Sequence, residues 1–195
     1  MAEAPEETPG QLKERFLRFR RGQTGERVFR CGLRPPYHAA GFCYCDASLP
    51  RALWFYLKAG LAQWILKLPF NSPKLWVLRR QGARIGRDVH IAVDVWIDPL
   101  FPELLEIEDD VTVGVGAKIA LHEFTVDEFR AGRVIIRKGA VIGGFSLIAP
   151  GVEIGERATV AGGAVVGRDV PAGSTAIGNP ARVRRHSSPA TEEHL

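Results

Sequence analysis

The second half of the chain places a branched apolar residue at every sixth position. The longest run comprises Ile136, Ile142, Ile148, Ile154, Val160 and Val166. Two shorter runs precede it, with an irregular step at residues 99–106: Ile85, Ile91 and Ile97, then Ile107, Val113 and Ile119. A period of six fits neither the 3.6-residue turn of a helix nor the two-residue alternation of a strand. It is typical of short strands joined by tight turns, so the sequence predicts an all-β solenoid.

Each repeat also carries a very small residue beside the aliphatic one, as in Ile142-Gly143 and Ile154-Gly155. We expect the aliphatic side chain to point inward and the small residue to lie where the backbone bends sharply, so that stacked repeats bury one continuous column. The alternative is an ordinary sandwich of regularly spaced strands, which would not keep one register over residues 136–166.

The repeats resemble those of the hexapeptide-repeat acyltransferases, including the galactoside and maltose acetyltransferases and their sugar-modifying relatives. The resemblance covers residues 85–185 and implies a left-handed parallel β-helix with three hexads to each triangular coil. The handedness comes from the family and not from the period. With this resemblance we expect an irregular, poorly ordered basic extension at 1–49, a helical segment at 50–84, the β-helix at 85–185 with an ejected loop at 122–133, and a disordered tail at 186–195.

The charge changes sign along the chain. Residues 47–87 contain no acid and eight bases, whereas residues 88–171 contain fourteen acids and seven bases. No apolar run is long enough for a transmembrane helix, and the N-terminus opens with Glu3, Glu6 and Glu7, where a secretory signal would be basic and then apolar. These features indicate a cytoplasmic protein, and no nucleic-acid partner is expected.

The three cysteines are odd in number and clustered, at Cys31, Cys43 and Cys45. This arrangement suits reduced thiols better than a disulfide framework. Together with His38 the thiols could hold a metal, but Cys43-x-Cys45 is not the usual spacing of a zinc knuckle. We therefore expect no metal cofactor.

Two helices are predicted ahead of the repeats, over residues 51–68 and 72–81, with Pro69 ending the first. The first is rich in Trp, Phe and Leu and carries few charges. Two interpretations stay open for it. Either its apolar face caps the open end of the solenoid, or the basic, aromatic segment 47–87 makes a peripheral contact with the inner face of a membrane.

The repeats break between Leu121 and Val134, where a polar loop at 122–133 begins with His122. A loop of this length in a regular solenoid is more often functional than accidental. The related acetyltransferases place their catalytic histidine at the start of the same loop. Transfer of an acyl group from a thioester to a hydroxyl needs a base with a near-neutral pKa, and the resemblance assigns that role to His122.

The resemblance also suggests the rest of the site. The backbone N–H of Gly144 would stabilise the oxyanion. Gly162 and Gly167 would lie beside the groove for acetyl coenzyme A, and the phosphates would meet Arg168, Arg182 and Arg185. Asp94 and Asp98 fall where relatives hold the acceptor, a small molecule or glycan, and each either binds a hydroxyl or faces solvent. The site would be completed by a neighbour in a homotrimer.

Two other function classes remain open. The γ-class carbonic anhydrases share the fold but need three histidines around a metal, and residues 85–185 contain only His90 and His122. A purely structural β-helix would need neither His122 nor the basic C-terminal segment. The identity of the acceptor and the length of the acyl group are not indicated by the sequence.

Overall fold

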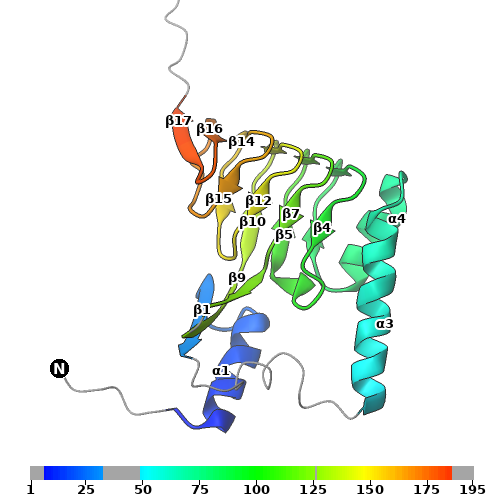
Figure 1. The fold of residues 1–195 in the computed structure, drawn as a ribbon, viewed down its shortest axis with the longest axis vertical. Helices are drawn as coiled ribbons and strands as arrows, with labels where there is room; N and C mark the ends of the chain where they lie inside the picture. Colours follow the sequence, from blue (N-terminus) through cyan, green and yellow to red (C-terminus); the bar gives the residue numbers. More distant parts are fainter. Residues whose placement is uncertain (1–6, 33–48, 126, 186–195) are drawn as a thin grey trace, which may run out of the picture.

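Short parallel strands wind into a solenoid of triangular coils (Figure 1). The computed structural model describes residues 7–32, 49–125 and 127–185. Each coil adds one strand to each of three sheets. The first sheet contains β2 (Arg84–Ile85), β5 (Leu105–Ile107), β10 (Val134–Ile136) and β13 (Glu153–Ile154). The second contains β3 (His90–Ile91), β6 (Thr112–Val113), β11 (Val141–Ile142), β14 (Thr159–Val160), β16 (Ser174–Ile177) and β17 (Arg182–Arg185). The third contains β4 (Trp96–Ile97), β7 (Lys118–Ile119), β12 (Leu147–Ile148) and β15 (Val165–Val166). The predicted parallel solenoid is confirmed.

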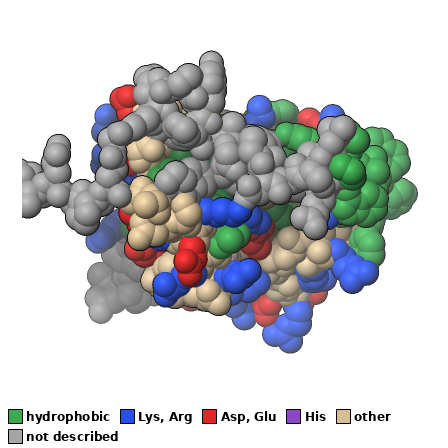
Figure 2. All heavy atoms as spheres, turned by 90° about the horizontal axis from the view of Figure 1, so that it is seen from below, with side chains coloured by type: hydrophobic (Ala, Val, Ile, Leu, Met, Phe, Trp, Pro, Cys, Tyr) green, Lys and Arg blue, Asp and Glu red, His purple; other side chains and the backbone are tan. Residues whose placement is uncertain are grey.

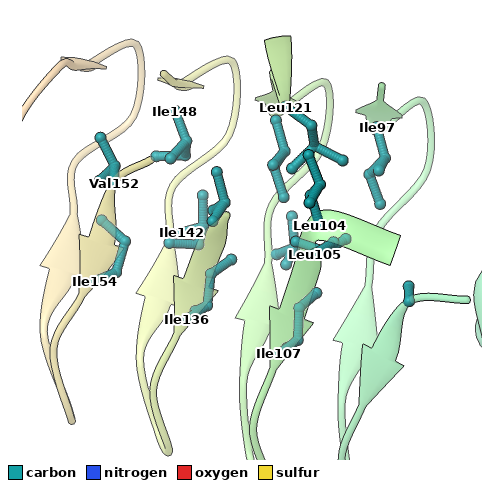
Figure 3. Packing of buried hydrophobic residues seen from close by; sticks show 14 of the residues in the cluster. Ile97, Leu104, Leu105, Ile107, Leu121, Ile136, Ile142, Ile148, Val152 and Ile154 are labelled. Carbon is teal, nitrogen blue, oxygen red and sulfur yellow. The ribbon is translucent and has the colours of Figure 1, made fainter. Parts of the chain in front are cut away.

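The six-residue repeat sets the register between coils. Ile136 pairs with Ile107 and Ile154, and Ile142 pairs with Val113 and Val160. Ile148 stands in the same relation to Ile119 and Val166 in the third sheet. These side chains are buried and stack inside the solenoid as a continuous core (Figure 3). Full burial of such a side chain contributes about 1.5–3 kcal/mol, so the stacked core stabilises the coils together.

The small residue after each aliphatic one is required by stacking rather than by the bend. A Cβ on Gly143 would lie 2.5 Å from the backbone nitrogen of Gly162 in the next coil, and one on Gly114 would lie 2.6 Å from that of Gly144. The sharp bend falls two residues later, where φ is positive, as at Gly116, Phe145 and Gly163. The expectation that the small residue marks the bend is therefore wrong by two positions.

Two insertions leave the coils at one corner. Residues 99–104 contain η1 (Pro102–Leu104) and bury Phe101. The predicted loop at 122–133 is an ordered hairpin of β8 (His122–Phe124) and β9 (Glu128–Gly132). An N-terminal strand, β1 (Val28–Gly32), pairs antiparallel with β9 and completes a small sheet beside the solenoid (Figure 1).

The described part of the N-terminal extension is folded, which corrects the expectation of an irregular segment. Helix α1 (Pro9–Arg20) begins with a capping box between Thr8 and Gln11. Its buried Phe16 and Phe19 pack in an aromatic cluster with Phe29, Phe101 and Phe129. Five clustered aromatic side chains supply enough apolar area to order this segment.

Cys31 lies in β1, and its burial raises the pKa of the thiol. The other predicted members of a metal site, His38, Cys43 and Cys45, lie outside the described residues, as does the predicted tail at 186–195.

Helices α3 (Leu49–Leu66) and α4 (Asn71–Arg80) stand at the first coil. Lys74 Nζ donates to the carbonyl oxygens of Ile91 and Ala92 at 2.9 and 2.6 Å. Asn71 bonds the backbone of Val89 and Ile91, while Gln63 donates to the carbonyl of Ile97 at 2.6 Å. These side chains satisfy backbone groups that no earlier coil can reach. Burial lowers the pKa of the Lys74 ammonium.

None of the helices in the described part of the chain combines the length and the apolar character needed to span a bilayer.

The stacking of small residues predicts a position-dependent effect of adding one methyl group. In Gly143→Ala the new Cβ meets the backbone of the next coil, so urea unfolding should show a loss of about 1–3 kcal/mol. Gly167 occupies the same place in its hexad but has nothing within 4 Å of an added Cβ. Gly167→Ala should therefore stay within about 0.5 kcal/mol of the parent. Equal losses in the two variants would contradict the stacking argument.

Candidate active site

His122 and Asp98 meet at the corner where the hairpin leaves the coil. The Nδ1 atom of His122 makes a short hydrogen bond with Oδ2 of Asp98. The same carboxylate oxygen accepts from the backbone N–H groups of Leu121 and His122, both at 3.1 Å, and Oδ1 accepts from Leu100 at 2.9 Å. Because an ionised carboxylate can only accept, the proton of a neutral His122 ring lies on Nδ1. Its Nε2 is left as a proton acceptor.

Aromatic rings surround the imidazole. The ring centroids of Phe101 and Phe124 each lie 5.4 Å from that of His122, almost perpendicular to it, and Phe129 lies at 6.2 Å. The His122 side chain keeps only 15% of its surface exposed. Contacts on several sides, together with the Asp98 bond, restrict the ring to one orientation. The arrangement suits a base that must meet its substrate at one defined atom.

An ion pair joins the two strands of the hairpin, and hydrogen bonds of Arg130 and Arg133 connect this region to distant parts of the chain. Arg130 in β9 pairs with Glu123 at 3.0 Å and donates to the carbonyl of Pro150 on the next coil at 3.1 Å. Arg133 donates to the carbonyl of Phe19 in α1 at 2.7 Å. Burial lowers the pKa of the Arg133 guanidinium. The N-terminal segment thus supports the hairpin that carries His122.

Asp98 has neither of the two roles that the sequence left open, binding of the acceptor hydroxyl or exposure to solvent. It is fully buried, and its oxygens are occupied by His122 and three backbone N–H groups. A carboxylate with these partners can neither face solvent nor accept from an acceptor hydroxyl. Asp94 is exposed in a turn with a φ of 58°, so its side chain stays a candidate for acceptor binding.

The position of Asp98 sets its hexad apart from most others in the sequence, although the amino-acid composition does not. After most aliphatic hexad residues the chain has Gly or Ala, but after Ile97 it has an acid. Charged residues also follow Ile107 and Ile136, and these two, Glu108 and Arg137, form an ion pair at 2.8 Å. A charge at this hexad position therefore indicates a paired side chain, but the sequence does not distinguish the buried Asp98 from the partly exposed Glu108 and Arg137.

The predicted residues fall into two rows, one on each side of the third sheet. The Gly144 row follows strands of the second sheet and contains Asp94, Gly144 and Gly162. Gly163 donates to the carbonyl of Gly144 at 2.9 Å, which joins two coils along this row. The His122 row follows strands of the third sheet and contains Asp98, His122, Gly167 and Arg168. One strand of the third sheet separates the rows in every coil, so a single chain does not bring Gly144 beside His122.

The terminal arginines lie at the far end of the solenoid (Figure 1). Strand β17 folds back antiparallel on β16 and places Arg182 opposite Ile177 and Arg185 opposite Ser174. The backbone N–H of Ala181 donates to the carbonyl of Val165 in the third sheet at 2.8 Å. The backbone of the next residue, Arg182, therefore lies near the Gly144 row. Arg168, Arg182 and Arg185 are exposed and have no recorded ion pair with any described residue.

The histidines of the solenoid are not arranged as a pair. His90 is exposed on β3 in the second sheet, whereas His122 lies beyond the third. No group of three His, Cys, Asp or Glu side chains suited to a metal ion occurs in the part of the chain that the structure describes.

Comparison with known proteins agrees with this architecture. Residues 133–168 match the family described as bacterial transferase hexapeptide, with six repeats. The candidate acetyltransferase YvoF of Bacillus subtilis is 35% identical over 116 residues, which cover 59% of this chain and 67% of that protein. The chain belongs to the hexapeptide-repeat acyltransferases. The prediction of an enzyme of the acetyltransferase class is confirmed at this level.

Two solved structures of this family share the fold. A hexapeptide-repeat acetyltransferase of Vibrio cholerae, complexed with acetyl coenzyme A, aligns with a TM-score of 0.56 and 20% identity over 72% of this chain and 91% of its own. A maltose O-acetyltransferase of Clostridium difficile aligns with a TM-score of 0.55 and 18% identity over 79% and 91%.

The contact between His122 and Asp98 predicts a single tautomer. For the neutral imidazole of His122, long-range ¹H–¹⁵N correlation spectra should show a protonated Nδ1 and an unprotonated Nε2. Asp98→Asn removes the negative acceptor and should populate the other tautomer. His90 has no carboxylate partner among the described residues and provides the internal control. A protonated Nε2 in the parent protein would contradict the assignment.

Proposed function

We propose that the protein transfers an acetyl group from acetyl coenzyme A to a hydroxyl of a sugar or glycan. The observation that carries the proposal is the contact of His122 Nδ1 with Asp98, which leaves Nε2 as the proton acceptor. Family membership supports the reaction class, and the acetyl coenzyme A complex of the Vibrio cholerae protein supports the donor. The maltose enzyme supports a sugar hydroxyl as acceptor.

In the proposed reaction the Nε2 atom of His122 accepts the proton of the acceptor hydroxyl. The hydroxyl oxygen then attacks the thioester carbonyl, and a carbon–oxygen bond forms. When the tetrahedral intermediate collapses, the carbon–sulfur bond breaks and the protonated His122 returns the proton to the leaving thiolate. Asp98 is a positioning residue, because it holds the Nδ1 proton and stabilises the transient imidazolium.

Other residues of the two rows have supporting roles in the proposal. The backbone N–H of Gly144 donates to the oxyanion. Gly162 and Gly167 have room beside them, since an added Cβ would meet nothing closer than 3.4 Å, and they leave space for the pantetheine arm. Arg168, Arg182 and Arg185 bind the phosphates of the coenzyme. Asp94 stays a candidate for contact with the acceptor.

The separation of the two rows supports a homotrimer. The Gly144 row of one protomer and the His122 row of its neighbour would face each other across a shared groove, and closed threefold symmetry would repeat this contact three times. The left-handed winding and the cytoplasmic location expected from the sequence are part of the same proposal.

Removal of the base is the first test. His122→Ala should keep the fold and coenzyme binding but lower kcat by about 10²–10⁴-fold, since that is the usual contribution of a general base. Asp98→Asn should lower kcat with little change in KM. His90→Ala removes an exposed histidine of the second sheet and should behave as the parent.

The measurement is release of coenzyme A in the presence of sugars, amino sugars and lipid-linked glycans, combined with calorimetric binding of coenzyme A. Near-normal turnover by His122→Ala with the working acceptor would contradict the role of His122. Failure of the parent to bind coenzyme A would favour a structural β-helix instead.

A shared site predicts complementation between inactive chains. His122→Ala removes the base from the His122 row, and Gly162→Phe blocks the groove beside the Gly144 row. Co-expressed with two different tags, the variants should form mixed trimers in which about a quarter of the sites contain two intact rows, if the chains mix at random. Placing both substitutions on one chain, co-expressed with itself, should yield no activity. A monomer in light scattering, or mixed assemblies as inactive as the doubly substituted chain, would overturn the shared site.

A further inference from the structure

Helix α3 presents an apolar stripe on the side away from the solenoid. Leu53, Leu57, Leu61 and Trp64 follow one another at intervals of four, four and three residues, and each is more than half exposed. Trp54 beside them is 60% exposed. We call these five residues the α3 stripe. Among the side chains of this helix that the structure describes, the buried ones are Ala59, Ala62 and Leu66, which lie on the opposite face at helical spacing.

The stripe is a continuous surface rather than scattered exposed residues. Figure 2 shows hydrophobic side chains gathered along the edge of the molecule that α3 forms. Single exposed leucines are common, but a contiguous apolar patch on a folded domain marks an interaction site. The capping role of the helix does not explain the stripe, because capping uses Gln63 and the small residues of the other face.

Within the described part of the chain, the charged side chains next to the stripe are lysines. Lys58 lies about 90° around the helix from the centre of the stripe, and Lys67 is in the turn directly after the last residue of α3. The Nζ atom of Lys58 lies 5.8 Å from the ring centroid of Trp54. Neither lysine has a recorded ion pair with a described residue, and residues 47–87 contain no acid at all.

Other bases of this segment are already used inside the protein. Lys74 and Arg79 bond backbone carbonyls of the first coil. Arg84 pairs with Glu106 at 2.9 Å, and Arg87 pairs with Asp109 at 2.8 Å. Arg80 is exposed on α4 and lies 5.7 Å from the ring centroid of Trp76. Among the described side chains of this segment, the bases without a carboxylate or carbonyl partner are therefore Lys58 and Lys67 beside the stripe and Arg80 on α4.

We infer that the α3 stripe docks on the surface of an anionic phospholipid bilayer. The leucines and tryptophans enter the interface between headgroups and acyl chains, and Lys58 and Lys67 meet the lipid phosphates. The inference is independent of the proposed reaction. A second copy of α3 would fit the apolar stripe equally well, but it would bring lysines together without an acid in the segment to pair with them.

Figure 1 shows the orientation that this contact would impose. The coils stack away from α3, and the β17 end is the most distant part of the solenoid. The solenoid would therefore project from the bilayer, with the coils nearest α3 closest to the lipid.

Flotation of the full-length protein with vesicles tests the inference. Vesicles of phosphatidylcholine with about 30% phosphatidylglycerol should bind the protein in about 0.05 M salt and bind it much less in about 0.5 M salt. Lys58→Glu/Lys67→Glu should weaken binding by at least about fivefold for each lysine lost. Leu57→Ser/Leu61→Ser should weaken it at least about tenfold.

Matched control variants test whether a loss of vesicle binding is specific to the α3 stripe. Arg18→Glu/Arg157→Glu makes the same change in net charge at two exposed sites elsewhere and should retain most of the binding. Ile177→Ser/Val183→Ser removes exposed apolar side chains at the far end and should also bind. Because all these residues are exposed, circular dichroism and melting temperature should match the parent, which checks that each variant is folded.

A second readout reports insertion directly. Lipids with brominated acyl chains should quench part of the tryptophan fluorescence of the parent, and Trp54→Phe/Trp64→Phe should lose that quenching while Trp76 and Trp96 still emit. Absence of binding at low salt would overturn the inference. Vesicle binding that the stripe variants leave unchanged would also overturn it. A third contrary outcome is that Leu57→Ser/Leu61→Ser reduces the size of the protein's assembly, because this would assign the stripe to contact with a second copy of the chain.

Discussion

Backbone contact between successive coils is the constraint on which the rest of this structure depends. Each strand of the solenoid is only two or three residues long over most of its length, so no strand could persist without the coils above and below. The coils approach so closely that a Cβ on Gly143 or Gly155 would lie 2.5 or 2.4 Å from backbone nitrogen atoms of the next coil. Any longer segment must therefore leave the solenoid at a corner, as residues 99–104 and the β8–β9 hairpin do.

The candidate site is a consequence of that departure. Ala120 still donates to the carbonyl of Ile148 in the next coil, but the next two backbone N–H groups turn toward Asp98. The carboxylate thus replaces the hydrogen-bond partners that the chain gives up when it leaves the coil. A buried charge is costly unless it is fully bonded, and here the same bonds that satisfy the backbone also orient His122. Structural and chemical requirements are met by one side chain.

Much of the solenoid could be predicted because the hexad repeat is a local pattern. The spacing of Ile136, Ile142 and Ile148 placed strands in the correct register, and the helices predicted at 51–68 and 72–81 lie within two residues of α3 and α4. The contact between Asp98 and His122 was missed, because it depends on a coil that closes around an irregular insertion. The packing of α1 against the hairpin joins Phe16 to Phe129 across most of the chain, and neither residue belongs to a repeat.

The regular stacking of the coils also fixes lengths along the solenoid. Neighbouring parallel strands are separated by about 4.8 Å, so the axial distance from the hairpin corner to the β16–β17 turn is set by the number of coils between them. Because each coil contacts only its neighbours, one more hexad triplet between β12 and β15 would move Arg182 outward by one such step and leave the surroundings of His122 unchanged. The number of coils therefore sets the length of the groove, and with it the length that a bound molecule needs in order to contact both ends.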